Sequence, residues 1–511
     1  MPRFLRQNAH WLIVAALVGA AYARTLAPGL SWANRGADGG DFITAAATGG
    51  VAHPSGYPTY LALARLFQLL PLGTLAFRTN LLSAVCAVAA AVLVTRWVAR
   101  QQRVTGAPFD GEIAQISGAL AGLAFGLSPL LWSQAVITEV HALHALFLAL
   151  LLTLAPLARP HPETSGWVDL AAGLLAGLAL GNHLTAALLL PAWFGLSLLR
   201  RIPDGAPLAR WLPQMAWRPV LRGLAGLALG ASIYLTLLLR ARSGAPVNWG
   251  DPVGWDGLRW LISGQLYRDR LFTLPADFVL PRVQSWAALL LAQFGLPGFA
   301  LALAGLFFGR PRSPRLFWIT GWMAAAYTAF AIGYNATDSY AYLIPVFLAV
   351  AVWLGLGAGA LLEAAARRGG PGRGRVLGAF AALAVAALLL INAASNLPAL
   401  DASRDDRAEQ FGRAVLAAAP PGALLFPQGD EQTFALWYFH FALRQRPDVA
   451  VINEALLPYD WYRASLRRAY PDLPLPDHPG PSGWPATLTA ATGRPACHPQ
   501  TDAPATLFCS P

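Results

Sequence analysis

Apolar runs long enough to cross a lipid bilayer recur along most of the chain, and this feature constrains its fold most strongly. Because a bilayer offers the backbone no water, each spanning segment must satisfy its own hydrogen bonds as a helix. Hydropathy and charged flanks predict eleven spans, at 10–27, 77–98, 114–133, 138–157, 168–182, 184–199, 219–239, 284–308, 316–333, 340–362 and 376–395. The short pair 168–182 and 184–199 also fits one broken element. The sequence therefore predicts an α-helical polytopic membrane protein.

The formal net charge of +11 does not indicate nucleic-acid binding, because the arginines follow membrane topology instead. They gather in loops that share one side if the N-terminus is cytoplasmic. These arginines are Arg3, Arg6, Arg96, Arg100, Arg103, Arg200, Arg201, Arg210, Arg218, Arg222, Arg310, Arg312, Arg315, Arg367, Arg368, Arg373 and Arg375. An odd number of spans then puts the C-terminal segment outside. We expect an integral protein of the bacterial cytoplasmic (inner) membrane.

Composition divides the chain into a transmembrane domain, 1–395, and an extracytoplasmic C-terminal domain, 396–511. In the second part, helical patterns near 404–418, 429–443 and 459–470 alternate with strand-like runs at 423–426 and 449–452. This alternation predicts a small α/β domain, and the Pro, Gly and Ser content after Pro471 predicts an irregular end. Cys497 and Cys509 lie in this end, where a disulfide is permitted, but the sequence does not decide whether they pair.

The first outside loop, 28–76, carries the most informative polar residues. Asp38 and Asp41 stand three residues apart before a helix-forming run, and His53 and Tyr57 follow in a Pro- and Gly-rich turn. One interpretation is structural: a carboxylate caps a helix, and His53 makes a hydrogen bond. The other is a general base with a partner that orients the substrate or a metal. Carboxylates near a membrane boundary are costly unless they are used.

Other polar side chains are also confined to the outside loops. We predict substrate-binding roles for His53, Tyr57, Glu139, His141, His183, Asn248, Trp249, Arg268, Arg270, Tyr334, Asp338 and Tyr340. Structural alternatives stay open: a polar helix start at Glu139, a polar turn at His183 and an interfacial aromatic belt at 334–342. The spacing of Glu139, His141 and His144 is not that of a known zinc motif. The sequence therefore predicts no required cofactor, although a divalent metal is compatible with it.

Five arginines depart from the inner-side pattern, in a tryptophan-containing outside loop. They are Arg240, Arg242, Arg259, Arg268 and Arg270. A planar guanidinium is well suited to a lipid phosphate, so they are candidates for that contact. The alternative is a loop that faces solvent or lipid headgroups, and the sequence does not select one arginine.

Several motifs together resemble the uncharacterised-domain family of polytopic membrane proteins related to the protein O-mannosyltransferases. The family pattern has an Asp-x-Gly-Glu segment and a His-Pro-Pro-Gly-Tyr-Pro-Leu segment after the first helix. Here these read Asp38-Gly-Gly-Asp41 and His53-Pro-Ser-Gly-Tyr-Pro-Thr59. Weaker matches are Arg78–Ser83, Glu139–His144, Gly181–His183, Asn248–Pro252, Tyr334–Tyr342, Gly429-Asp430 and Arg446–Val449.

The resemblance implies a GT-C type glycosyltransferase that works on the extracytoplasmic side with a polyprenyl-phosphate sugar, mannose in particular. Asp38 would be the catalytic base, and Asp41 the second acidic residue, one methylene shorter than the family's Glu. The implied reaction is inverting transfer to a hydroxyl, as in protein O-glycosylation. The implied partners are the lipid-linked donor, a protein or glycan acceptor and membrane lipid, with no nucleic acid.

Two function classes compete with this hypothesis. A lipid-linked sugar transporter or flippase would place polar residues near the membrane midplane and often repeats its halves, neither of which the sequence shows. A non-enzymatic membrane scaffold would explain the tail but not the cluster in the first loop.

Overall fold

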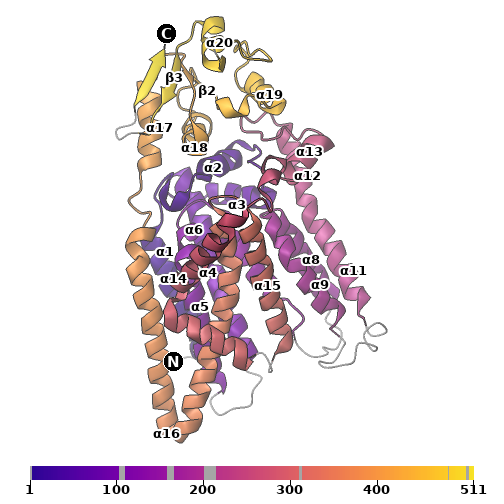
Figure 1. The fold of residues 1–511 in the computed structure, drawn as a ribbon, viewed down its shortest axis with the longest axis vertical. Coiled ribbons are helices and arrows are strands. Elements are labelled where there is room, and N and C mark those ends of the chain that lie inside the picture. Colours follow the sequence, from indigo (N-terminus) through magenta and orange to yellow (C-terminus); the bar gives the residue numbers. More distant parts are fainter. Residues whose placement is uncertain are drawn as a thin grey trace.

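The computed structural model describes residues 3–102, 110–157, 166–200, 215–309, 313–481, 483–501 and 506–510. It consists of a long helical body and a smaller C-terminal domain that sits on one end of it (Figure 1). Of the arginines predicted on the inner side, Arg103, Arg201, Arg210, Arg310 and Arg312 lie outside the described residues, as do the side chains of Arg3 and Arg6.

The helical body contains the elements that the hydropathy pattern predicts as spans. They are α1 (Arg3–Thr25), α4 (Leu75–Gln102), α5 (Asp110–Gly126), α6 (Pro129–Ala135), α7 (His141–Thr153), α8 (Gly166–Leu180), α9 (Leu190–Leu198), α11 (Trp217–Ala231), α12 (Leu235–Ala241), α14 (Ala276–Gly309), α15 (Pro314–Gly333) and α16 (Ile344–Leu400). The arms of α16, Ser339–Arg368 and Gly372–Leu400, are each long enough to cross a membrane. The fold is thus the predicted polytopic helical one.

The number of spans stays a prediction. Among the described residues, six helices are long and apolar enough to cross a membrane, or seven if the pair α5–α6, bent by 63°, is one span. Three further apolar helices are shorter, at His141–Thr153, Gly166–Leu180 and Leu184–Leu198. One apolar run is divided at Pro129, where proline supplies no backbone N–H, and the short pair of runs is divided by the polar turn at Asn182-His183.

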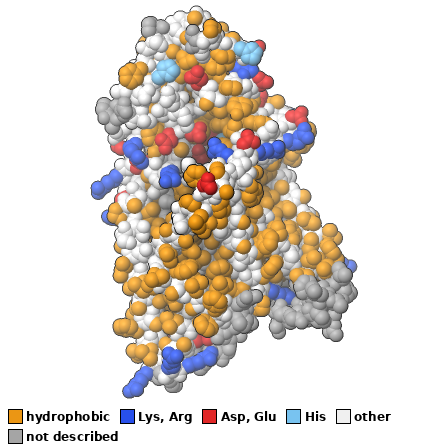
Figure 2. All heavy atoms as spheres, in the orientation of Figure 1, with side chains coloured by type: hydrophobic (Ala, Val, Ile, Leu, Met, Phe, Trp, Pro, Cys, Tyr) orange, Lys and Arg blue, Asp and Glu red, His pale blue; other side chains and the backbone are white. Residues whose placement is uncertain are grey.

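The outer surface of the helical body is apolar, as a lipid-facing surface requires. Large exposed side chains on it include Leu229, Phe307, Phe380 and Ile391, which are 60–75% exposed. Figure 2 shows hydrophobic side chains covering this body, while charged side chains gather at its lower end and at the junction with the C-terminal domain. An apolar area of this extent would be unstable in water, so the protein is an integral membrane protein.

Short elements fill the junction between the helical body and the C-terminal domain. They are η1 (Ala33–Arg35), α2 (Gly39–Thr48), α3 (Pro58–Gln68), η2 (Leu184–Leu189), α13 (Trp255–Ile262), η5 (Gln265–Arg270) and η6 (Ser339–Leu343), whereas η4 (Ser232–Tyr234) joins α11 to α12 within one span. Local sequence sets their ends: Gly49 closes α2 in the left-handed region at φ 74°, and Pro58 opens α3 as its first residue. The first outside loop is therefore largely helical and rigid.

The C-terminal domain is the predicted small α/β unit. Its elements are α17 (Arg407–Ala418), β1 (Leu424–Leu425), α18 (Gly429–Trp437), η7 (Tyr438–Ala442), β2 (Ala450–Val451), η8 (Glu454–Leu456), α19 (Asp460–Ala469), α20 (Gly483–Thr492), β3 (Ala496–Pro499) and β4 (Leu507–Ser510). The sheet order is β2-β1-β3-β4, with β1 parallel to β2 and β3, and β4 antiparallel to β3.

The prediction of an irregular end after Pro471 is wrong, because α20, β3 and β4 lie in that segment. The Pro and Gly content of this segment does not indicate its two strands of four residues each. These strands are stabilised by pairing, β3 with β1 and β4 with β3. Cys497 and Cys509 are directly paired across β3 and β4 and form a disulfide. Sequence alone had left that bond open.

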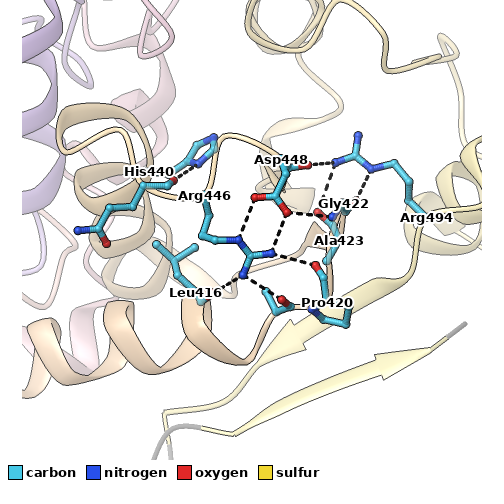
Figure 3. A network of polar contacts seen from close by, with 10 residues as sticks. Leu416, Pro420, Gly422, Ala423, His440, Arg446, Asp448 and Arg494 are labelled. Carbon is cyan, nitrogen blue, oxygen red and sulfur yellow. Dashed lines mark hydrogen bonds and ion pairs between the residues drawn. The ribbon is translucent and has the colours of Figure 1, made fainter.

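A network around Arg446 and Asp448 holds the C-terminal domain together (Figure 3). The Arg446 guanidinium donates to both Asp448 carboxylate oxygens at 2.9 and 2.8 Å and to the Ala419 carbonyl at 2.9 Å. The Asp448 carboxylate accepts the Gly422 N–H at 3.0 Å, and Arg494 donates to the Asp448 carbonyl at 3.0 Å. The end of α17 and the starts of β1, β2 and β3 are therefore tied at one point.

Candidate active site

A cavity of about 690 Å³ lies where the first outside loop, the ends of several membrane helices and the C-terminal domain meet. Nine of the predicted site residues line it: Asp38, His53, Tyr57, Glu139, His141, His183, Arg270, Tyr334 and Asp338. These residues come from five separate stretches of sequence. The fold therefore brings most of the predicted site into one concave space, which is the usual form of a small-molecule site.

Asp38 stands at the N-terminal end of α2 and faces this cavity. Its side chain makes no capping hydrogen bond to the helix, so the structural interpretation of this carboxylate as a cap does not hold. The side chain keeps 39% of its surface exposed because it opens onto the cavity. A carboxylate that is accessible there and not committed to the helix is free to act on a bound molecule.

Asp41, one turn later in α2, is fully buried and its two oxygens are occupied by protein donors. One oxygen lies 2.7 Å from the His53 Nδ1 and accepts the His53 backbone N–H at 2.9 Å. The other oxygen accepts the Trp249 indole N–H at 3.1 Å. The opposite ring nitrogen of His53, Nε2, lies 3.7 Å from Asp38. Asp41 thus holds the imidazole that stands beside Asp38.

Burial and charge set the protonation of this group. Burial raises the pKa of Asp38 to about 6, against the opposing charge of His53 and with the added repulsion of Asp430, Asp41 and Asp338. Burial acts to lower the pKa of His53, but the charge of Asp38 and the hydrogen bond to Asp41 outweigh it and raise that pKa to about 9. At neutral pH, therefore, His53 is a cation beside an ionised Asp38.

Glu139 is a further carboxyl group that lines the cavity, in the loop before α7. It is 8% exposed, and burial raises its pKa to about 8, with the charge of Asp38 adding to the effect. At neutral pH this group is mostly protonated, so it can donate a hydrogen bond to a ligand hydroxyl. Asp38 and Glu139 thus differ in protonation, with Asp38 as hydrogen-bond acceptor and Glu139 as donor.

Aromatic rings line one end of the cavity. The His183 ring lies 5.5 Å from the rings of both His141 and Tyr342, and 6.4 Å from that of Tyr57. A hydrogen bond of 2.7 Å between the His183 Nδ1 and the Thr185 hydroxyl fixes the imidazole. Flat rings with polar edges offer both apolar contact and hydrogen bonds, which suits a sugar ring.

The structure distinguishes between Arg268 and Arg270, which the sequence could not rank as candidates for a phosphate contact. A 3₁₀ helix has three residues per turn, so Tyr267 and Arg270 share one face of η5, and Gln265 and Arg268 share another. The first pair lines the cavity, whereas the second lines a separate apolar groove beside Trp255. Arg270 is therefore the one of the two that can reach a phosphate in the site.

Arg35 is a second cation in the cavity, and the sequence analysis missed it. It follows Asn34 in η1, and its guanidinium lies 5.1 Å from the centre of the Tyr340 ring. Within the described residues, neither Arg35 nor Arg270 forms an ion pair with a carboxylate. Two guanidinium groups on one cavity, each packed on a tyrosine ring and without a carboxylate partner, suit an anionic ligand.

Five predicted site residues do not line the cavity: Asp41, Asn248, Trp249, Arg268 and Tyr340. The prediction that Asn248, Trp249, Arg268 and Tyr340 contact the substrate is corrected accordingly. The Asn248 amide donates to the Asp251 carboxylate at 2.6 Å within its own turn, and the Trp249 indole N–H donates to the Asp41 carboxylate. Tyr340 packs under Arg35, and Arg268 faces the neighbouring groove. All but Arg268 therefore support the wall of the cavity from behind.

The cavity residues that were not predicted include four charged or phenolic ones: Arg35, Tyr267, Asp430 and Glu431. Arg35 could have been found from its position three residues before Asp38. The last two belong to α18 of the C-terminal domain, and the weak family match at Gly429-Asp430 does not by itself place them beside Asp38, some 390 residues earlier. Only the docking of the two domains brings them together.

In the part of the chain that the structure describes, no group of three or more His, Cys, Asp or Glu side chains has an arrangement that could hold a metal ion. The neighbouring imidazoles of His141 and His183 pack as rings, and the nearest partner of the His183 Nδ1 is a hydroxyl.

Two family models match this chain. Residues 38–204 match the Protein O-mannosyl-transferase TMEM260 N-terminal domain, and residues 408–478 match TMEM260-associated domain 2. These matches support the resemblance of the chain to a family related to the protein O-mannosyltransferases. The first match begins at Asp38 and the second covers α18, whereas Arg35, Arg270 and the wall segment at 330–342 lie outside both matched regions.

Curated relatives agree with this assignment. The chain is 27% identical over 495 residues to the mouse Protein O-mannosyl-transferase TMEM260, covering 91% of this chain and 65% of the relative. It is 21% identical to the Dictyostelium discoideum protein of the same name, covering 89% and 58%. The chain thus spans less than two thirds of the length of these relatives.

Solved structures share the fold. ArnT from Cupriavidus metallidurans bound to undecaprenyl phosphate superposes with a TM-score of 0.57 at 16% identity, covering 97% of this chain and 93% of that one. ArnT in the apo state gives 0.53 at 14% identity, covering 88% and 90%. The overall fold is therefore of the GT-C type, as the resemblance implied.

Proposed function

We propose that this protein is a membrane glycosyltransferase that transfers a sugar, mannose in particular, from a polyprenyl phosphate to a hydroxyl of an extracytoplasmic acceptor. One observation carries the proposal: the cavity joins an accessible carboxylate base, Asp38, to two guanidinium groups, Arg35 and Arg270, that have no carboxylate partner among the described residues. Transfer of a sugar from a lipid phosphate to a hydroxyl needs a base for the hydroxyl proton and cationic groups that stabilise the leaving phosphate.

The reaction we propose is a single displacement with inversion. The Asp38 carboxylate takes the proton of the acceptor hydroxyl while the acceptor oxygen forms a bond to the anomeric carbon. The bond between that carbon and the phosphate oxygen breaks, and polyprenyl phosphate leaves with the bonding electrons. Arg270 and Arg35 stabilise the phosphate charge as it develops, and the aromatic wall around His183 holds the sugar.

The names of relatives support this proposal and supply its finer points. The relatives are named protein O-mannosyl-transferases, which favours mannose as the sugar and a protein as the acceptor. The ArnT structure is bound to undecaprenyl phosphate, which favours a polyprenyl-phosphate donor. We further propose that the cavity opens on the extracytoplasmic side of the bacterial inner membrane, with the N-terminus in the cytoplasm, because the inner-side arginines require that orientation.

We also propose that transfer needs no metal ion, since the Arg35 and Arg270 guanidinium groups would neutralise the phosphate charge instead. Activity of the purified protein should persist in excess EDTA. Loss of activity in EDTA that added Mg²⁺ or Mn²⁺ restores would contradict this part of the proposal.

Proteoliposomes loaded with radiolabelled polyprenyl-phosphate mannose test the function against its competitors. A glycosyltransferase releases polyprenyl phosphate and labels an acceptor from membrane lysate. A transporter would move the intact lipid across the bilayer without releasing phosphate. A scaffold would do neither and would tolerate loss of both Asp38 and Asp41.

A further inference from the structure

The C-terminal domain lies directly on the helix that carries the catalytic base. In Figure 1, α18 lies against α2, and the contact is closest at Gly40. A β-carbon built on Gly40 would lie 2.3 Å from the Phe434 carbonyl oxygen, which no side chain could accommodate. The second glycine of the Asp38-Gly-Gly-Asp41 segment is thus required by the approach of α18.

The same face of α18 reaches His53. Residues four apart share one face of a helix, so Asp430 and Phe434 point to the same side. The Phe434 ring is stacked on the His53 ring, with 6.4 Å between centres and 10° between planes, and it also packs on Trp249 at 6.2 Å. One turn earlier, Asp430 lines the cavity with Asp38 and His53.

Asp430 has no visible structural task. Within the described residues its carboxylate takes part in no hydrogen bond and no ion pair, although burial raises its pKa and the charge of His53 lowers it. The Asp430 side chain is exposed on the cavity wall, so its carboxylate is available to act on the neighbouring His53.

The charged and titratable groups around His53 come from every element of the cavity wall. Asp38 and Asp41 face it from α2, and Asp430 faces it from α18. Farther groups on the same cavity are Arg35 of η1, Glu139, Arg270 of η5, Asp338 at η6 and Glu431 of α18. Among these, Asp430 is the carboxylate that the C-terminal domain holds near His53 and Asp38.

We propose that Asp430 is a positioning residue of the active site, and that the C-terminal domain is thereby a working part of the catalytic unit. Its carboxylate favours the protonated form of His53, and α18 keeps that ring stacked between Asp38 and Asp41. The domain would then be needed for the chemical step and not only for recognising an acceptor.

The first test does not depend on the proposed function. The full-length protein, labelled with ¹³C at histidine Cε1, is titrated by NMR in nanodiscs, and the His53 signal is assigned by its loss in His53→Gln. In Asp430→Asn the midpoint of His53 should fall by about half a pH unit, as expected for removing one nearby opposite charge. The control Glu454→Gln, which removes an exposed charge elsewhere in the domain, should leave it unchanged. An unchanged midpoint in Asp430→Asn would overturn the proposal.

The second test uses donor turnover and rests on the proposed function. Removing Asp430 also removes a like charge near Asp38, so the acid limb of the pH–rate profile should move to lower pH in Asp430→Asn and stay in place in Asp430→Glu. A profile that keeps its position while the rate falls would indicate a merely structural role and contradict the inference. Absence of turnover in the wild type would refute the proposed function, and the NMR titration alone would then decide this inference.

Discussion

Asp41 holds His53 through two hydrogen bonds to a single carboxylate oxygen, at 2.7 Å from the ring nitrogen Nδ1 and 2.9 Å from the backbone N–H. Since the other ring nitrogen lies 3.7 Å from Asp38, the orientation of the imidazole beside the base depends on Asp41. Asp41 is fully buried and does not line the cavity, but it orients His53, which does.

Asp41→Asn should lower transfer activity about 10- to 100-fold, because a hydrogen bond between charged groups contributes about 1.5–3 kcal/mol. The asparagine keeps one oxygen but cannot hold both His53 and Trp249 as the carboxylate does. Initial rates of the purified variant measure this. Asp256→Asn serves as the control, since its side chain is 91% exposed and its ion pair with Arg259 lies on the surface. Equal rates for the two variants would argue against a role for Asp41.

The pH–rate profile should be bell-shaped. Asp38 must be ionised to take a proton, and its raised pKa means that activity falls as the pH drops through about 6. His53 must be protonated to pair with Asp38 and Asp41, and its raised pKa means that activity falls as the pH rises through about 9. Rates of donor turnover between pH 4.5 and 10 would test both limbs. A rate that stays constant down to pH 4.5 would exclude Asp38 as the base.

Arg270→Gln should raise the KM for the donor about tenfold or more, since charge-assisted hydrogen bonds to phosphate contribute about 1.5–3 kcal/mol. Arg268→Gln is a matched control, because it removes the same group from the opposite face of the same short helix. Its KM should stay within about twofold of the wild type. Similar effects in both variants would mean that the loop acts through its total charge and not through a site.

Gly40→Ala and Gly39→Ala should differ sharply although they change adjacent residues of one helix. A β-carbon at Gly40 meets the Phe434 carbonyl at 2.3 Å, whereas at Gly39 the nearest atom is 3.5 Å away. Both changes raise helix propensity by up to about 1 kcal/mol, so their difference isolates the contact with α18. Gly40→Ala should expose the C-terminal domain to limited proteolysis and reduce activity. Equal protease resistance in both variants would contradict the observed packing of α18 on α2.

The first outside loop could be read from sequence because its residues are neighbours in the chain. Asp38, Asp41, His53 and Tyr57 come from 20 consecutive residues, and unusual polarity beside a membrane span singles them out. Sequence could not separate Arg268 from Arg270, because only the three-residue period of η5 decides which of them faces the cavity. Gly429-Asp430 is only a weak match to the family, and sequence could not place Asp430 in the site, because it reaches the cavity through the docking of a separate domain. Likewise, β3 and β4 are stabilised by pairing and not by local propensity.

The most direct measurement is the release of polyprenyl phosphate from radiolabelled polyprenyl-phosphate mannose by the purified wild type and Asp38→Asn proteins, with membrane lysate as acceptor. Asp38→Glu is assayed beside them. The wild type should release lipid phosphate and label an acceptor, Asp38→Glu should retain part of this activity, and Asp38→Asn should lose about 100-fold or more, the usual contribution of a positioned base. Full activity in Asp38→Asn would contradict the central claim that this carboxylate activates the acceptor hydroxyl.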